Sequence, residues 1–157
     1  ALTNPWIEAG CMEVIPGSHR LGQLHHAEHR EATHNLLSRG QTITVELDTS
    51  HTEFMPVRAG QFSLHHTHLV HNSRPNLSAD RRVGLGISYI PTTVRCSSRT
   101  RLTAMRVRGT DRYGHFDDEP RPRVDFGAAE RAAHADADAR FRASNVEQTS
   151  RYAPASR

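Results

Sequence analysis

The chain has 157 residues, the length of one ordinary domain, and its 36% hydrophobic content is that of a folded protein with a thin core or polar tails. The formal charge is only +3, and all twenty basic residues are arginine. No apolar run reaches the roughly 18 residues of a membrane span, so we expect no membrane partner.

Short strands dominate the first half of the chain. Cys11 to Ile15 is apolar and ends at Pro-Gly, which predicts a strand followed by a turn. Leu21 to Arg39 is polar and histidine-rich and predicts a loop that has room for one helical turn. Ile43 to Leu47 alternates between apolar and polar residues and predicts a half-buried strand. A turn at 58–60 then precedes a predicted strand from Gln61 to His65.

The strongest strand pattern comes later. Leu69 to His71 begins one strand, Asn72 to Asp80 is a loop rich in Asn, Ser and Pro, and Val83 to Ile90 is a strand that Pro91 ends. Short strands at close spacing predict antiparallel pairing, because no helical pattern separates them. We therefore expect a mainly β fold, a β-sandwich or jelly roll, rather than a βαβ fold.

The last third of the chain has a different character. Asp125 to Ala143 predicts a helix that Asp125 caps and whose alanine-rich stripe makes it peripheral. The residues after Ser144 read as a frayed tail. The arginine-rich stretch from Arg95 to Arg108 leaves a basic adaptor for nucleic acid as an alternative, but no stripe of aromatic and basic residues supports it.

Two cysteines bear on the compartment. Cys11 and Cys96 are far apart and outside any C-x-x-C spacing, so neither a disulfide framework nor a cysteine zinc site is predicted. We expect a reducing, cytoplasmic setting, with Cys11 packed as a small apolar residue in its strand. The chain opens without Met, as though cut from within a longer protein, and we expect a fragment.

Histidines gather in two places. His25, His26 and His29 could form a metal pair on a helix, although surface histidines are the favoured interpretation. In a strand, residues of equal parity share a face, so the second group divides into His66 with His68, and His65 with His71. No face then offers three adjacent imidazoles for zinc. A non-enzymatic, cupin-like module that chelates metal through His25, His26, His65, His66 or His68 remains an alternative.

His71 is followed in the sequence by two polar residues of a different kind, Ser73 and Arg82. If its strand and the one beginning at Val83 are adjacent and antiparallel, the loop between them brings His71 and Arg82 to one end of the sheet. A metal ligand and a fixed guanidinium suit a small dicarboxylate, and the Ser73 hydroxyl can donate one more hydrogen bond. Spacing alone equally allows Arg82 to pair with Asp80 or solvent, Ser73 to cap a turn and His71 to be an ordinary strand-end residue.

Three ordered blocks carry a resemblance that favours the first interpretation. They are GCMEVIPGSHRLG, AGQFSLHHTHLVHNSRPNLSADRRVGLGISYIP and VRGTDRYGHFDDEPRP. Together, from Ala1 to about Pro122, they resemble the C-terminal half of the phytanoyl-CoA dioxygenase family. The resemblance implies part of a double-stranded β-helix (jelly roll, cupin-like) in residues 1–122, followed by a helix and flexible tail in 123–157. It also implies an iron(II)- and 2-oxoglutarate-dependent oxygenase with a small-molecule substrate and no nucleic-acid partner.

The resemblance assigns roles residue by residue. His71 corresponds to the distal iron-binding histidine, Arg82 to the arginine that grips the distal carboxylate of 2-oxoglutarate, and Ser73 to its hydroxyl helper. No catalytic residue beyond these metal and cosubstrate ligands is implied. For His19, in the Pro-Gly-Ser-His turn, and for His115 we favour structural or interface roles.

One part of the family pattern is absent in context. The family takes its other two iron ligands from a His-x-Asp pair upstream of these blocks, whereas those letters occur here only at His134-Ala135-Asp136, within the predicted helix. A facial triad needs three ligands, so we expect the missing ligands to lie outside this chain and the chain alone to be inactive. Hydroxylation and halogenation, in which chloride replaces the carboxylate ligand, both stay open.

Overall fold

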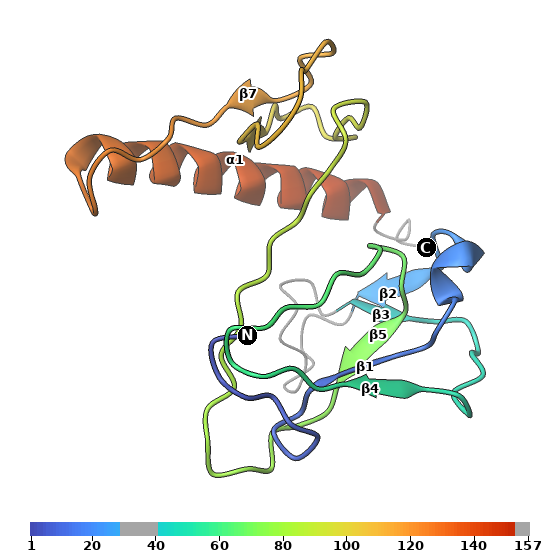
Figure 1. Cartoon of the computed structure of the whole chain (residues 1–157). Helices are drawn as coiled ribbons and strands as arrows, with labels where there is room; N and C mark the ends of the chain where they lie inside the picture. Colours follow the sequence, from blue (N-terminus) through green and yellow to red (C-terminus); the bar gives the residue numbers. More distant parts are fainter. Residues whose placement is uncertain (29–40, 153–157) are drawn as a thin grey trace. The chain divides into compact units, whose positions relative to one another are not determined.

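The computed structural model describes residues 1–28 and 41–152. The chain forms two compact units, Ala1–Ile87 and Ser88–Arg157, whose elements are labelled in Figure 1. Short strands characterise the first unit, and one long helix characterises the second. All of the residues expected to bind iron or cosubstrate belong to the first unit.

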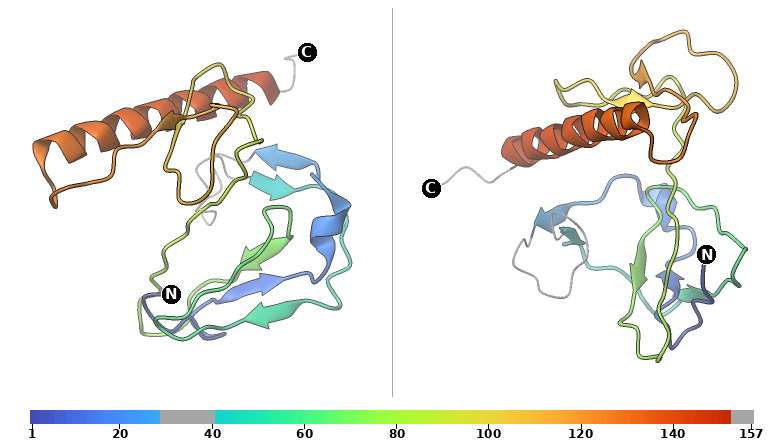
Figure 2. Two further views of the ribbon diagram at one scale, coloured as in Figure 1. Left: turned by 45° about the horizontal axis from the view of Figure 1, so that its top comes forward. Right: turned by 90° about the vertical axis from the view of Figure 1, so that its left-hand side faces the viewer.

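A three-stranded antiparallel sheet is the centre of the first unit (Figure 2). Strand β1 (Met12–Val14) lies between β4 (Glu53–Met55) and β5 (His71–Ser73). Val14 is opposite Glu53 on one side and opposite His71 on the other. Because both edges of β1 are paired, its backbone is the most fully satisfied of the three strands.

Local sequence explains why β1 takes the central place. Cys11 is fully buried and Val14 is 6% exposed, which gives the strand an apolar anchor at each end. Gly10 turns into the strand at φ +70°, and a Cβ there would lie 2.3 Å from the carbonyl oxygen of Arg74. Only glycine allows this close approach. The strand ends before Pro16, which has no N–H to donate to a ladder.

A second, two-stranded antiparallel ladder joins β2 (His26–Glu28) to β3 (Gln41–Ile43), and a 3₁₀ turn occupies Ser18–Leu21. The predicted strand from Ile43 to Leu47 is wrong apart from its first residue. Val45, which was expected to face a core, is 38% exposed. The predicted loop from Leu21 to Arg39 contains β2, and its part after residue 28 lies outside the described residues.

Two further strand predictions are wrong. Neither Gln61 to His65 nor Val83 to Ile90 is a strand in the structure, and their apolar side chains are exposed: Phe62, Leu64, Leu85, Ile87 and Tyr89. Alternation marks a strand only where a neighbouring strand supplies hydrogen bonds and a covering layer, and within the described ranges no strand lies beside either segment. The short strand β4 was missed because its three residues are too few to show an alternating pattern.

The predicted fold class is confirmed in part. The structure has small antiparallel sheets and one C-terminal helix, as expected, but the described residues form no closed barrel. The jelly roll therefore stays a prediction. One pairing departs from the antiparallel expectation, since β6 (Thr103–Ala104) and β7 (Asp117–Asp118) in the second unit are parallel.

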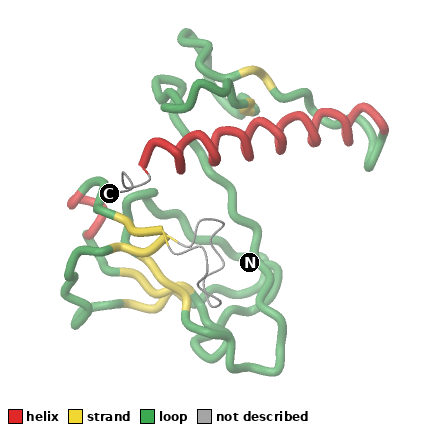
Figure 3. The backbone as a smooth tube through the Cα atoms, turned by 180° about the vertical axis from the view of Figure 1, so that it is seen from behind, coloured by secondary structure: helices red, strands yellow, loops and turns green. Residues whose placement is uncertain are grey.

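The helix α1 (Ala128–Tyr152) is shifted toward the C-terminus relative to its prediction (Figure 3). It begins three residues after Asp125, because Phe126 has a left-handed backbone with φ 55°. The acidic residue of its first turn is Glu130, whose carboxylate accepts the Arg123 N–H at 3.1 Å. In the described parts of the chain, no helix is long and apolar enough to cross a membrane.

The tail expected to fray after Ser144 is instead helical to Tyr152. Ser144 is 2% exposed, and its hydroxyl lies 3.7 Å from the Cys96 thiol. One turn later, the carboxylate of Glu147 accepts the Arg99 N–H at 2.7 and 2.8 Å. These polar contacts hold the helix against residues 96–100 and extend it beyond the predicted end at Ala143.

Candidate functional site

Strand β5 carries two of the three predicted site residues. His71 and Ser73 are its first and last residues, so strand alternation directs both side chains to the same face. Val14 and Met12 lie opposite them on β1. Both His71 and Ser73 are exposed and therefore accessible to a ligand.

The imidazole of His71 is oriented by its own backbone. Its Nδ1 lies 2.8 Å from the Leu69 carbonyl oxygen. A carbonyl can only accept a hydrogen bond, so Nδ1 carries the proton and Nε2 keeps a free lone pair. Metal-binding histidines commonly donate their second ring N–H to a carbonyl in this way, which fixes the tautomer. His71 is therefore a suitable metal ligand through Nε2.

The neighbouring histidines are arranged differently. The Nδ1 of His66 accepts the backbone N–H of His68 at 3.1 Å, so its Nε2 carries the proton and offers no lone pair. Ring contacts pair His66 with His68 at 5.0 Å between centroids, and His65 with His71 at 5.4 Å. These are the pairs expected from parity, although the segment forms a turn rather than a strand.

The second group of histidines gives no stronger metal site. His26 lies in β2 and its Nδ1 contacts the Leu24 carbonyl at 2.8 Å, whereas His29 is outside the described residues. Across residues 1–28 and 41–152, no three His, Cys, Asp or Glu side chains come together in a group able to hold a metal ion. The alternative of a self-contained metal-binding module thus gains no support here.

The Pro-Gly-Ser-His turn supports the strand that carries His71. Ser18 is 4% exposed, and its hydroxyl oxygen accepts the Val70 N–H at 2.8 Å. The Val70 carbonyl in turn accepts the Ile15 N–H at 3.0 Å. These two bonds fix the residue directly before His71. His19 lies in the 3₁₀ turn with its ring 5.8 Å from that of His66, which suits the structural role expected for it.

Arg82 approaches the sheet from the other end. Its Nη1 donates a hydrogen bond to the Gly10 carbonyl, and the next residue is tied to the N-terminal segment through Val83 N–H and Thr3 Oγ1 at 2.9 Å. Gly10 precedes the β1 partner of Ser73 by two residues and that of His71 by four. The structure thus brings His71 and Ser73 together on β5 and fastens Arg82 to the turn before β1.

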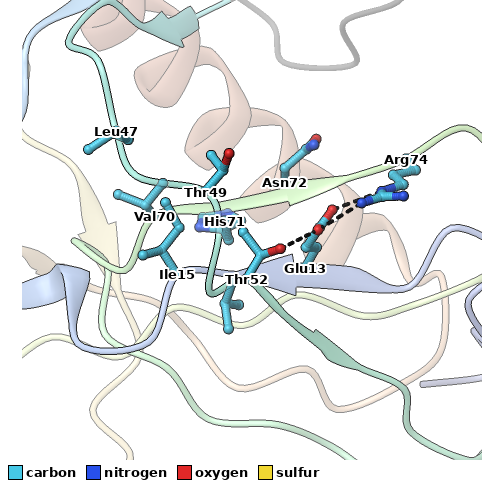
Figure 4. Close-up of a pocket in the computed structure, with 10 residues that line it drawn as sticks. Glu13, Ile15, Leu47, Thr49, Thr52, Val70, His71, Asn72 and Arg74 are labelled. Atoms are coloured by element: carbon cyan, nitrogen blue, oxygen red, sulfur yellow. Dashed lines mark hydrogen bonds and ion pairs between the residues drawn. The ribbon is translucent and has the colours of Figure 1, made fainter.

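A pocket of about 350 Å³ lies over the neighbouring strands (Figure 4). It is lined by β1, β5 and the loop before β4: Glu13, Val14, Ile15, Leu47, Thr49, Thr52, Val70, His71, Asn72 and Arg74. Glu13, 7% exposed, accepts hydrogen bonds from Arg74 Nε and Nη2, both at 2.9 Å, and from Thr52 Oγ1 at 2.7 Å. We call Glu13, Arg74 and Thr52 the carboxylate clamp.

The clamp sets the charge state of its members. Hydrogen bonds from Arg74 and then Thr52 hold the pKa of the Glu13 carboxyl below its ordinary value, and Glu13 in turn raises the pKa of Arg74. Sequence reasoning missed the clamp, although one signal was present. A glutamate inside the apolar run Cys-Met-Glu-Val-Ile is rarely buried unless a cation pairs with it.

Acid should weaken the first unit through Glu13. Because the folded state lowers the pKa of this carboxyl, its contribution to stability is complete above the unfolded-state pKa of about 4.3. The contribution is lost as the pH falls through the lower, folded-state value. We expect the melting temperature to decrease as the pH is lowered beyond about 4. This decrease should be less steep in the Glu13→Gln variant. Equal slopes in the two proteins would contradict this assignment.

Comparison with known proteins gives a match over the part of the chain that contains the candidate site. The family profile Phytanoyl-CoA dioxygenase (PhyH) matches residues 1–84, more than half of the 157-residue chain. The chain belongs to the phytanoyl-CoA dioxygenase family. This confirms the resemblance seen in the sequence. No curated protein and no solved structure matches the chain. His71, Ser73 and Arg82 fall within the matched residues, and the block ending at Pro122 lies beyond them.

The phytanoyl-CoA dioxygenase family is generally iron-dependent. The possible metal ligands of this chain can therefore be compared with those that an iron site requires. A facial triad requires two histidines and one carboxylate. Among the described residues, His26 and His71 each leave Nε2 free, but they belong to no group of three metal-binding side chains. His134 and Asp136 lie on α1 in the second unit, where Asp136 pairs with Arg140 at 2.9 Å. The described residues alone therefore do not fit an iron site.

Proposed function

We propose that this chain forms part of an iron(II)- and 2-oxoglutarate-dependent oxygenase that hydroxylates a small molecule. Family membership supports the oxygenase class. The observation that carries the proposal is the His71 ring, whose Nδ1–H is committed to the Leu69 carbonyl while Nε2 remains free. In this proposal His71 provides one iron ligand, and the remaining ligands come from outside the described residues.

Ser73 and Arg82 are proposed to hold the distal carboxylate of 2-oxoglutarate. A guanidinium has five N–H donors, and the Gly10 carbonyl takes one of them in Arg82. The free donors match a carboxylate in a two-bond fork, and the exposed Ser73 hydroxyl adds a further donor. The bond to Gly10 would then serve to hold the arginine side chain in place.

Replacing Arg82 tests this assignment. In the enzyme with a complete iron site, Arg82→Lys keeps the charge but loses the planar fork, so we expect 2-oxoglutarate to bind about tenfold more weakly. The neighbouring arginine gives a matched control, and Arg81→Lys should leave the dissociation constant unchanged. Isothermal titration calorimetry measures both. Equal affinity in the two variants would exclude Arg82 as the carboxylate anchor.

A further inference from the structure

The arginine of the carboxylate clamp uses only part of its hydrogen-bonding capacity within the clamp. Glu13 occupies the side-on fork of Arg74, formed by Nε and one Nη2 hydrogen. The end-on fork, formed by Nη1 and the other Nη2 hydrogen, has no partner among the described residues. The guanidinium carbon lies 4.9 Å from the centre of the Phe54 ring, which together with Glu13 holds the group in one orientation. A fixed guanidinium edge is therefore available to a ligand.

Other pocket residues add to this edge. The side chains of Asn72 and Thr49 are exposed and have no hydrogen-bond partner in the part of the chain that the structure describes. Both oxygens of Glu13, in contrast, already accept hydrogen bonds. The free guanidinium edge of Arg74, the Asn72 amide and the Thr49 hydroxyl therefore give the pocket several unused donors, which suit a ligand that accepts hydrogen bonds.

The remaining wall of the pocket is apolar. Ile15, Leu47 and Val70 are half-buried and line it together with the polar groups. This wall can cover a short hydrocarbon chain, whereas a second charged group would lie against apolar side chains at a desolvation cost. One free guanidinium edge and one apolar wall thus match a single carboxylate that carries an aliphatic tail.

We propose that this pocket binds a small aliphatic monocarboxylate, with the carboxylate on the end-on fork of Arg74 and the tail against Leu47. The site is separate from the proposed 2-oxoglutarate site, which uses Ser73 and Arg82. Strand alternation also directs Glu13 and Asn72 to the face of the sheet opposite that of His71 and Ser73. His71 nevertheless lines the pocket as well, so a bound ligand would lie beside the proposed iron ligand, while its carboxylate anchor, Arg74, is distinct from Ser73 and Arg82.

Titration of the full chain with pentanoate tests the proposal. Pentanoate should shift the NMR signals of the Asn72 side-chain amide and of Arg74 Nε–H, and neutral pentanamide should bind at least about tenfold more weakly. Arg74→Lys keeps the charge but loses the fork and should weaken pentanoate binding about tenfold. Arg58→Lys, an equal change at an exposed arginine outside the pocket, should have no effect.

A second variant keeps the test decisive if Arg74→Lys disturbs the fold. Leu47→Trp fills the pocket without touching the clamp and should abolish pentanoate binding. Binding that survives this change, a wild-type chain that ignores pentanoate, or equal affinity for pentanamide would each overturn the proposal. Arg82→Lys separates this site from the oxygenase assignment, because it should weaken 2-oxoglutarate binding and leave pentanoate binding unchanged.

Discussion

Replacing His71 by alanine should abolish 2-oxoglutarate turnover in the enzyme that contains this chain. The variant removes the one imidazole in the described residues that combines a fixed tautomer, a free Nε2 and a place beside Ser73. Loss of groups that merely orient metal ligands already costs 10- to 100-fold, so we expect a loss of about 100-fold or more in iron affinity and in succinate formation. Metal analysis and single-turnover assays measure the two effects.

The neighbouring histidines supply the matched control for this prediction. His66→Ala removes a ring of the same size from the same segment, but its Nε2 carries a proton and is not free to bind metal. Iron affinity should therefore remain within about threefold of wild type, since the change removes no ligand. Turnover that survives in His71→Ala, or that is lost equally in both variants, would remove the basis of the iron-ligand assignment.

The second large effect concerns stability. Glu13→Ala should lower the melting temperature of the first unit by about 5 °C or more, because Arg74 and Thr52 lose their acceptor at the centre of the sheet. Fluorescence of Trp6, the single tryptophan of the chain, follows unfolding of this unit. Glu53→Ala changes an exposed glutamate on β4 and serves as the control, with a shift of at most about 1 °C.

A double variant separates the ion pair from simple loss of packing. Replacing both charges, as in Glu13→Leu with Arg74→Met, leaves no unpaired charge and should recover much of the lost melting temperature. A double variant as unstable as Glu13→Ala would instead show that the clamp contributes mainly by its shape.

Local sequence was sufficient for some features and not for others. Strand β1 could be predicted because its apolar run ends at Pro16-Gly17, a turn signal that acts within a few residues. The association of His71 with Ser73 came from the family resemblance, because the sequence pattern placed Ser73 in a loop whereas the structure has it at the end of β5. The pairing of Glu13 with Arg74 across 61 residues could not be found from local sequence, because it depends on the register between β1 and β5. No local pattern specifies that register.

Two errors show how tertiary contacts override local pattern. Val83 to Ile90 has the clearest alternation in the chain, yet the described residues give it no neighbouring strand and its apolar side chains stay exposed. The end of α1 shows the opposite error, because the local pattern predicted no helix there and the structure has one. Its last turns have no apolar stripe. They are held by the hydrogen bonds that Glu147 accepts from the Arg99 and Thr100 N–H groups and by the contact of the Ser144 hydroxyl with the Cys96 thiol. In both segments the tertiary contacts, and not the intrinsic strand or helix propensity of the residues, decide the structure.

The central position of β1 also sets the order in which the sheet can assemble during synthesis. β1 leaves the ribosome first, but its partners are encoded only at residues 53–55 and 71–73. At ordinary elongation rates of about 5 to 20 residues per second, β1 waits roughly 3 to 12 s for its second neighbour. A nascent chain paused between those two points carries β1 with one edge covered by β4 and the other edge open to foreign polypeptides.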